Sequence, residues 1–327
     1  MNVVLDAQTG GDRSSNLVPP SLSSLDRQNQ RISHLHEICT RLGYTTVDTN
    51  RLSKKSLSRM NHIFVLDEFK TLFCFIPKVG CTGWKRLLLL LSGAINSTDA
   101  ISQANVHILA QKKLLTLPKL DVEGATERLR NYTTFLFVRE PFARILSAYR
   151  DKFLLSSGRN LYIRKYFTQL ISGSARRKSF EQKQNVSSNS SDTKKDTVTF
   201  SDFVDYVGNF WNTLDLPAEE HWREMFRLCA PCDIRYDFIG HFETLQEDSR
   251  MILNKLGVPE GVKFPDSTNP TNSSASSIFD QFYGQLSREQ IESLYRRLST
   301  DMELFDYPIP ASIKMRINAS SAFTDFI

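Results

Sequence analysis

The stretch from Thr71 to Leu91 limits the possible folds of this chain more than any other. Its pattern predicts a short buried strand from Leu72 to Ile76, a tight loop from Pro77 to Gly83, and a helix that begins near Trp84. Such a loop, leading from a strand into a helix, directs backbone N–H groups and the positive end of the helix dipole at one point. The stretch therefore predicts an anion-binding loop of the kind that holds phosphate.

A second unit of the same kind lies further along the chain. The run from Tyr132 to Val138 is β-branched and aromatic, as is typical of a central strand, and Phe142 to Phe153 follows with helical spacing. Pro141 suits the first helical turn, where the N–H that it lacks is not needed. Lys78 and Arg139 would both lie at the carboxyl ends of strands, where ligands bind in open α/β sheets. The two units together predict a site for a nucleotide with phosphates at two separate positions.

The rest of the chain also alternates between strands and helices. We expect strands from His62 to Leu66 and from Tyr236 to Gly240, and helices from His221 to Leu228 and from Glu243 to Leu256. This alternation predicts an α/β fold with a central, mainly parallel sheet flanked by helices.

The sequence predicts one domain with flexible ends. Residues 1–50 read as an N-terminal arm or stem remnant, polar at first and with a short helix from Arg31 to Leu42. The domain is expected at 51–310, with a disordered Ser- and Lys-rich insert at about 172–199 and a C-terminal tail at 311–327.

The composition, 40% hydrophobic and 24% charged over 327 residues, is that of a globular protein. The net charge of +5 suits an anionic ligand without identifying one. The basic residues of the two units cluster in loops rather than along one face with aromatic residues between them, which disfavours a nucleic-acid partner. No apolar run approaches the roughly 20 residues of a membrane span, and no signal peptide is visible at the N-terminus.

Five cysteines are too few for a disulfide scaffold of this size. Cys229 and Cys232 have C-x-x-C spacing but no second pair to complete a zinc site, so a local disulfide or two plain thiols are favoured over a redox centre. Six glycosylation triplets modestly favour a lumenal protein, at Asn96, Asn131, Asn185, Asn189, Asn272 and Asn318.

The first loop lacks the G-x-x-x-x-G-K-S/T pattern of nucleotide hydrolases, which disfavours NTP hydrolysis. Three stretches carry a resemblance instead: Ile76 to Arg86; Phe137 to Phe153; and His221-Trp222 with Cys229, Cys232, Tyr236 to Leu245 and Asp248. In this order they resemble the Golgi carbohydrate sulfotransferase family, which includes the chondroitin and dermatan 4-O-sulfotransferases and the HNK-1 sulfotransferase. The first is similar to the family's 5′-phosphosulfate loop and the second to its 3′-phosphate motif.

The resemblance implies a P-loop-like sulfotransferase fold, 3′-phosphoadenosine 5′-phosphosulfate (PAPS) as sulfuryl donor, and no metal. Around the 5′-phosphosulfate it places Pro77, Lys78, Val79, Gly80, Cys81, Thr82 and Gly83. Around the 3′-phosphate it places Arg139, Glu140, Pro141, Phe142, Ala143, Arg144, Ile145, Leu146 and Ser147.

Within these sets the resemblance implies distinct roles. Lys78 would neutralise charge on the leaving oxygen, while Arg139 and Ser147 would bind the 3′-phosphate. Arg144 and Arg150 would either supplement that binding or form ion pairs with Glu140 and Asp151. Cys81 is interpreted as a packing residue, because direct displacement needs no covalent intermediate.

The acceptor proton requires a base, and histidine is the usual candidate near neutral pH. The sequence offers His107, which follows the first loop as in related sulfotransferases, and His221, with His107 slightly favoured. Two loop residues depart from the family pattern: Gly80 stands where Ala is usual, and Gly83 where Asn is usual. We expect the loss of the Asn side chain to weaken PAPS binding.

The expected reaction is sulfuryl transfer from PAPS to a glycan hydroxyl, at position 4 of GalNAc in a chondroitin or dermatan chain. Alternatives are terminal glucuronic acid, a GalNAc on a glycoprotein, or a non-catalytic glycan- or nucleotide-binding relative. The family implies the Golgi, where its members are held by an N-terminal anchor that this sequence does not show.

Overall fold

The computed structural model describes residues 23–44, 52–154, 166–171, 198–210, 219–266 and 273–317. A five-stranded sheet lies at its centre, in the order β3-β1-β2-β4-β5. The strands are β1 (Ile63–Leu66), β2 (Thr71–Cys74), β3 (Leu115–Thr116), β4 (Thr133–Val138) and β5 (Phe238–His241). Because β2, β4 and β5 are parallel neighbours and β1 is antiparallel to both β2 and β3, four of the five strands run in the same direction. The predicted α/β fold with a mainly parallel sheet is confirmed.

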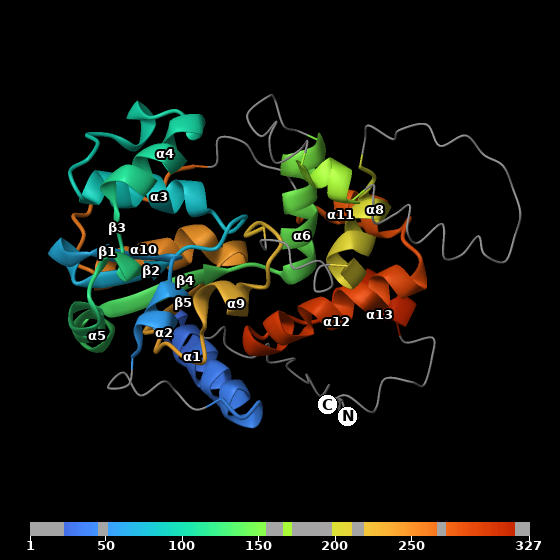
Figure 1. Ribbon diagram of the computed structural model, residues 1–327, viewed down its shortest axis with the longest axis horizontal. Helices are drawn as coiled ribbons and strands as arrows, with labels where there is room; N and C mark the ends of the chain where they lie inside the picture. The colour runs from blue at the N-terminus through green and yellow to red at the C-terminus, as the bar shows by residue number, and fades with distance from the viewer. Residues whose placement is uncertain are drawn as a thin grey trace, which may run out of the picture.

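Helices surround the sheet (Figure 1). The α-helices are α1 (Ser24–Arg41), α2 (Lys54–Ser58), α3 (Cys81–Leu91), α4 (Gln103–Lys113), α5 (Val122–Asn131), α6 (Pro141–Tyr149), α8 (Phe200–Asp205), α9 (Met225–Cys229), α10 (Leu245–Lys255), α11 (Ser276–Tyr283), α12 (Arg288–Leu304) and α13 (Ala311–Ile317). Short 3-10 turns are η2 (Asp67–Phe69), η3 (Thr98–Ala100), η4 (Leu117–Lys119) and η7 (Phe242–Thr244), and π-helical turns are η5 (Arg150–Leu154) and η6 (Tyr206–Phe210).

Two hydrophobic clusters stabilise this arrangement. The first lies on the sheet, where Trp84 of α3 packs its ring 5.0 Å from Phe135 and 4.9 Å from Phe137 of β4. The second lies between α6, α8, α11, α12 and α13, which Figure 1 shows grouped beyond the end of β4. Trp222 and Phe203 are fully buried in it. The helix α6 therefore connects the sheet to the second cluster.

Helix α1 begins at Ser24, before the expected start at Arg31, and it packs against the sheet. The Gln28 side chain donates to Ile239 O (3.0 Å) and accepts from Ile239 N (3.1 Å), satisfying the outer edge of β5. The segment expected as an arm therefore includes a helix that packs on the sheet, because its side chains bind a strand far away in the sequence. At the other end, α13 packs against α12 with Ile313 and Ile317 buried, so part of the expected tail is also ordered.

Residues 1–22, 45–51, 172–197 and 318–327 lie outside the described residues, and with them most of the predicted insert. Helix α9 begins at Met225, not at the expected His221, because the Asp301 carboxylate of α12 accepts from Met225 N (2.7 Å) and Phe226 N (2.8 Å) and fixes the helix start there. Within the described part of the chain, no helix has the length and apolarity needed to cross a membrane.

The C-x-x-C pair forms no local disulfide. Cys232 is bonded to Cys39 of α1, and Cys229 to Cys74 of β2. The Cα atoms of these pairs are 5.4 and 5.8 Å apart, although 193 and 155 residues separate them in the sequence. Tertiary packing alone brings these partners together, so the prediction of a local disulfide or two thiols was wrong. The fifth cysteine, Cys81, is free.

Candidate active site

The loop between β2 and α3 has the backbone geometry of an anion-binding turn. Lys78 and Gly80 both adopt the left-handed conformation, with φ of 71° and 70°. Gly80 is the N-cap residue, so α3 begins at Cys81, three residues before the expected Trp84. No side chain caps this helix. The first N–H groups of α3 are therefore not bound by a capping side chain and suit an anion.

The second motif begins differently. Pro141 occupies the first turn of α6 as predicted, and the Glu140 carboxylate caps the helix by accepting from Phe142 N (3.0 Å) and Ala143 N (2.6 Å). Burial raises the pKa of Glu140 to about 7. The N-terminus of α6 is thus already bound by a side chain of its own chain, unlike that of α3.

Charged residues of the second motif hold the first loop from one side. Arg139 donates from Nη1 to Lys78 O (3.1 Å) and from Nη2 to Ser274 Oγ (2.8 Å). Arg144 donates from Nε to Pro77 O (3.0 Å). Because β2 and β4 are parallel neighbours, the loops that follow them lie next to each other, and these contacts become possible.

Arg144 is buried, and its guanidinium binds main-chain oxygens around the first loop. It is 1% exposed, and its remaining guanidinium nitrogens donate to Arg223 O (2.8 Å) and Glu220 O (3.1 Å). It therefore joins the loop to the turn that precedes α9, and it does not form the ion pair with Glu140 that the sequence suggested. Arg150 likewise lies over the Phe282 ring, 5.7 Å from its centroid, instead of pairing with Asp151.

Arg139 retains a donor that suits a phosphate. Its guanidinium is buried and lies 4.3 Å from the centroid of the Phe242 ring, and burial lowers its pKa to about 10, which leaves it charged at neutral pH. Its Nε is buried and has no hydrogen-bond partner among the described residues. An unsatisfied buried donor beside an uncapped helix fits a ligand with two anionic groups.

Several other residues that the sequence assigned to the donor site have buried side chains. Val79 is buried in the sheet cluster, and Ser147 is buried on α6. Four apolar side chains of α6 are also buried, those of Phe142, Ala143, Ile145 and Leu146. These residues position the loop and the helix, and their side chains face the core.

Lys78 points to a carboxylate that the sequence had not assigned to it. Lys78 Nζ lies 3.4 Å from Asp151 Oδ2, and Lys152 Nζ lies 3.3 Å from the same oxygen. Both partners belong to the π-helical turn η5, where a continuous helix had been expected. Although burial opposes it, the charges of Lys78 and Lys152 lower the pKa of Asp151.

His107 lies beside the first loop, as the resemblance implied. Its Nε2 is 3.3 Å from Thr82 Oγ1, and its Nδ1 is 3.2 Å from Lys85 Nζ. A lysine ammonium can only donate, so Nδ1 accepts and Nε2 carries the proton that points to Thr82. Desolvation of the ring and the charge of Lys85 lower the pKa of His107 to about 4. Both ring nitrogens are thereby engaged.

His221 is arranged differently. Its Nδ1 is hydrogen-bonded to the Glu219 carboxylate, which leaves Nε2 as the acceptor of the ring. Burial and the nearby charge of Lys152 hold its pKa well below the usual value, so the ring is neutral at physiological pH. Lys78, Asp151 and Lys152 interact electrostatically with both histidines, so both predicted candidates face the same cluster. Glu219 was missed, since nothing in its sequence surroundings marked it.

Phe264 explains the glycine at position 83, whereas at Gly80 the left-handed backbone, with φ of 70°, favours glycine. A Cβ atom on Gly83 would lie 2.5 Å from Phe264 Cζ, and one on Gly80 would lie 3.4 Å from the same atom. The Phe264 ring also packs 5.2 Å from Trp84. It fills the volume that an Asn side chain at position 83 would need.

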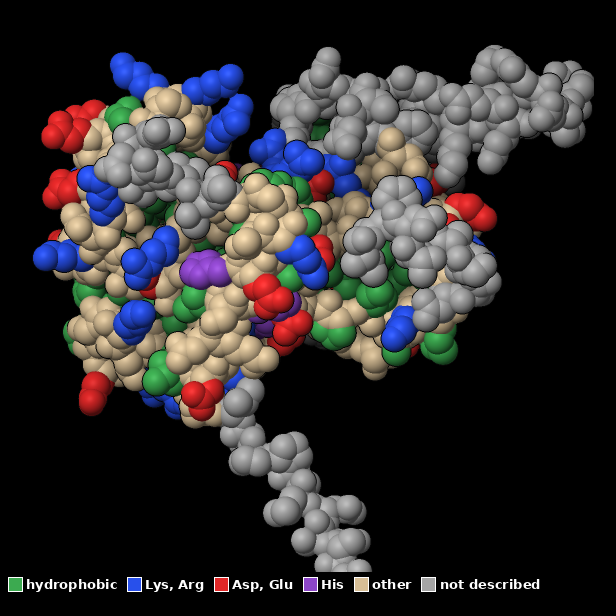
Figure 2. All heavy atoms as spheres, turned by 90° about the horizontal axis from the view of Figure 1, so that it is seen from below, with side chains coloured by type: hydrophobic (Ala, Val, Ile, Leu, Met, Phe, Trp, Pro, Cys, Tyr) green, Lys and Arg blue, Asp and Glu red, His purple; other side chains and the backbone are tan. Residues whose placement is uncertain are grey.

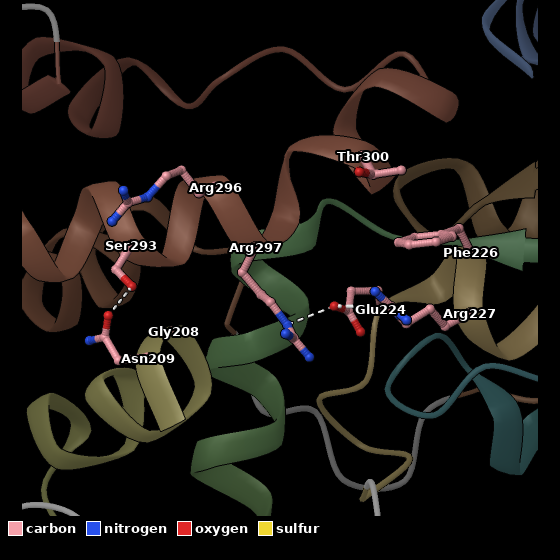
Figure 3. A pocket seen from close by; sticks show the side chains of 9 residues that line it. All are labelled: Gly208, Asn209, Glu224, Phe226, Arg227, Ser293, Arg296, Arg297 and Thr300. Atoms are coloured by element: carbon pink, nitrogen blue, oxygen red, sulfur yellow. Dashed lines mark hydrogen bonds and ion pairs between the residues drawn. The ribbon is translucent and has the colours of Figure 1, made fainter. Parts of the chain in front are cut away.

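A separate polar cavity of about 360 Å³ lies between α12, η6 and the start of α9 (Figure 3). Its buried carboxylate, Glu224, is bound by Arg297 (2.6 Å) and Arg227 (3.4 Å), and Ser293 Oγ donates to Asn209 Oδ1 (2.7 Å). These lining side chains bind one another, which stabilises the contact between the helices.

Comparisons with known proteins agree with this geometry. A model described as the sulfotransferase family matches residues 61–308, which include the first loop, the second motif and both histidines. The chain belongs to the sulfotransferase family. Carbohydrate sulfotransferase 11 of Rattus norvegicus is 34% identical over 258 residues, 78% of this sulfotransferase and 70% of that protein. Carbohydrate sulfotransferase 14 of Danio rerio is 33% identical over 303 residues, 91% and 76% of the two chains.

A third relative has the same description. Carbohydrate sulfotransferase 10 of Gallus gallus is 33% identical over 287 residues, 86% of this sulfotransferase and 75% of that protein. No solved structure matches the chain. The similarity to these relatives shows that this protein is a carbohydrate sulfotransferase, as the resemblance had implied.

Proposed function

We propose that this carbohydrate sulfotransferase has a P-loop-like core and transfers the sulfuryl group of PAPS, without a metal, to position 4 of GalNAc in a chondroitin or dermatan chain. The observation that carries the donor assignment is the contact between the two motifs at Lys78. The uncapped N-terminus of α3 suits the phosphosulfate, and the unsatisfied Nε of Arg139 suits the 3′-phosphate.

Lys78 supplies the charge that the reaction needs. During transfer the sulfur–oxygen bond to the 5′-phosphate breaks while a bond to the acceptor oxygen forms, and negative charge develops on the leaving oxygen. The ammonium of Lys78 extends from the loop that would hold this group, and its backbone is fixed by Arg139. A positive charge in a buried loop stabilises the developing anion more than a solvated one would.

We assign the acceptor base to His221 rather than to His107. A carboxylate that binds Nδ1 orients the imidazole and stabilises the proton that arrives at Nε2, as in other His–carboxylate pairs. Glu219 provides this contact to His221. His107 has no comparable partner, because the ammonium of Lys85 binds its unprotonated nitrogen and opposes protonation.

Terminal glucuronic acid and GalNAc on a glycoprotein are alternative acceptors, and the polyanionic chain is favoured by the net charge of +5. Figure 2 presents a face on which Lys and Arg side chains stand among Asp and Glu side chains, so a chain crossing it would meet both signs of charge.

We further propose that the protein works in the Golgi lumen. Two disulfides support an oxidising compartment. Two of the glycosylation triplets begin at exposed residues, Asn96 and Asn131. Glycosidase treatment of the protein from secretory cells would shift its electrophoretic mobility if these or other triplets are occupied, and an unchanged mobility would count against the lumenal assignment.

The test of the activity uses labelled PAPS and a panel of desulfated chondroitin, dermatan, heparan and glycoprotein acceptors, followed by disaccharide analysis. We expect label at position 4 of GalNAc in chondroitin or dermatan, and none with Lys78→Met. Label at glucuronic acid or on the glycoprotein would establish an alternative acceptor. Tight binding of adenosine 3′,5′-bisphosphate with no transfer to any acceptor would indicate the non-catalytic relative.

A further inference from the structure

We propose that Asp151 is a positioning residue that holds the ammonium of Lys78 toward the donor site and competes with the donor for it. This inference rests on the proposed use of Lys78 in sulfuryl transfer. Asp151 itself would touch neither the sulfuryl group nor the acceptor oxygen in this role.

The contacts of Lys78 come from both ends of the second motif. Arg139, which precedes α6, holds the main-chain oxygen of Lys78 at 3.1 Å, and Asp151, which follows α6, holds its ammonium at 3.4 Å. The backbone of Lys78 is in the left-handed conformation that non-glycine residues rarely adopt. The lysine is thus fixed at its carbonyl and at its charge by residues separated by one helix.

The π-helical turn η5 brings Asp151 to this position. The sequence predicts a regular helix that ends at Phe153, and the observed π-helical turn widens the helix where Asp151 contacts Lys78 of the loop. Single π-helical turns within helices occur frequently at functional sites. The side chain of Asp151 is 32% exposed while those of Lys78 and Lys152 are 16% and 7% exposed, so one carboxylate balances two largely buried ammonium groups.

The charged groups around Lys78 act in opposite directions. Burial lowers the pKa of Lys78, Asp151 and then Cys81 raise it, and Lys152 lowers it further. Cys81 of α3 also interacts electrostatically with the ammonium, as do His107 of α4 and His221 of the turn before α9. With both histidines held neutral, Asp151, Cys81 and Lys152 are the ionisable groups that decide whether Lys78 stays protonated.

Two effects follow for the donor. A bound phosphosulfate would present a second anion to Lys78, so the donor and Asp151 compete for one ammonium at neutral pH. In the free enzyme Asp151 keeps that ammonium charged as the pH rises. Removing the carboxylate should therefore tighten the binding of an anion at neutral pH. It should also let Lys78 lose its proton, and with it the anion, at a lower pH than in wild type.

The experiment compares wild type with Asp151→Asn and Lys152→Met, which keep the shape of the side chains. Binding of adenosine 3′,5′-bisphosphate is measured calorimetrically from pH 6 to 10, and kcat/KM is measured over the same range. For Asp151→Asn we expect several-fold tighter binding at pH 7 and a lower kcat. We also expect binding and kcat/KM to fall off on the alkaline side of their pH profiles at a pH about 1 unit or more lower than in wild type. For Lys152→Met we expect the alkaline limb of the same profiles to move to a higher pH.

The outcomes separate this inference from the proposed function. If wild type does not bind the bisphosphate, the donor assignment fails and Asp151 has no role in it. If wild type binds it but both variants keep the alkaline limb in place, Asp151 does not control Lys78. A uniform loss of affinity and kcat in Asp151→Asn with an unmoved limb would show a purely structural role and would also overturn the inference.

Discussion

Lys78, to which we assign the neutralisation of charge on the leaving oxygen, has an unusual backbone conformation. Its φ of 71° costs roughly 1–2 kcal/mol relative to a right-handed conformation. Contacts from Arg139 to its carbonyl and from Arg144 to the preceding carbonyl stabilise the turn. The lysine can therefore point away from the strand direction while its loop remains fixed.

His221→Gln tests the assignment of the base. Because Glu219 orients His221 and leaves Nε2 free, we expect its replacement to lower kcat by roughly 10²- to 10⁴-fold with bisphosphate affinity unchanged. His107→Gln should lower kcat less, since the two ring nitrogens of His107 are bound to Thr82 and Lys85. Single-turnover rates decide between them. A larger loss in His107→Gln would assign the base to His107, as the sequence favoured.

Gly83→Ala tests the packing of Phe264 on the loop. The added Cβ would meet the Phe264 ring at 2.5 Å, and overpacking of this kind costs about 1–3 kcal/mol. In a Phe264→Leu background the cost should fall substantially, because the obstructing ring is gone. Gly261→Ala is a matched control, since nothing lies within 4 Å of its new Cβ. Strictly additive free energies of unfolding in urea would exclude the contact as the cause.

At the level of elements, helix α6 positions the residues at both of its ends that contact Lys78. Its start is fixed by Pro141 and by the Glu140 cap, and its end opens into η5. Between these points its apolar side chains enter the second core. The helix therefore aligns Arg139 and Asp151 on either side of Lys78.

Glu140→Gln should change how stability depends on pH. The pKa of Glu140 rises from the usual 4.5 to about 7 on folding, so between these values the folded state holds a proton that the unfolded state has lost. The stability of wild type should therefore fall, relative to Glu140→Gln, as the pH rises from about 4.5 to 7. Urea unfolding of both proteins at pH 4.5, 6 and 8 measures this. A constant difference between them would contradict it.

At the level of the whole molecule, the two disulfides tie α1 and β2 to the segment that ends α9. Each closes a long loop, and the loss of one is expected to cost about 2–4 kcal/mol. We therefore expect Cys39→Ser and Cys74→Ser to lower the urea midpoint clearly, and Cys81→Ser to change it little, because Cys81 is free.

Thiol labelling checks the same pairing. Alkylation of the native, unreduced protein should modify Cys81 alone among the five cysteines, and reduction before alkylation should expose the other four. A peptide that contains Cys229 joined to Cys232 in a non-reducing digest would contradict the observed pairs.

Local sequence patterns were sufficient to predict most of the strands and helices. Alternating strands and helices, the glycine-containing loop, Pro141 at a helix start and the positions of Lys78 and Arg139 all depend on neighbours within a few residues. The predicted α/β fold was confirmed, and the sulfotransferase family that the motifs indicated was confirmed by the comparisons. Helix starts were less accurate at α1, α3 and α9, where distant or unusual contacts fix the first turn.

Which of those residues contact one another depends on the tertiary fold. The parallel pairing of β2 and β4 lets Arg144 bind the main-chain oxygen of Pro77 in the first loop. Phe264 occupies the space beside Gly83, the cysteines of the C-x-x-C pair bond to separate partners, and η5 carries Asp151 to Lys78. Each of these contacts joins residues whose separation along the chain leaves no periodic signal, because only the closed packing of the fold brings them within a few ångströms.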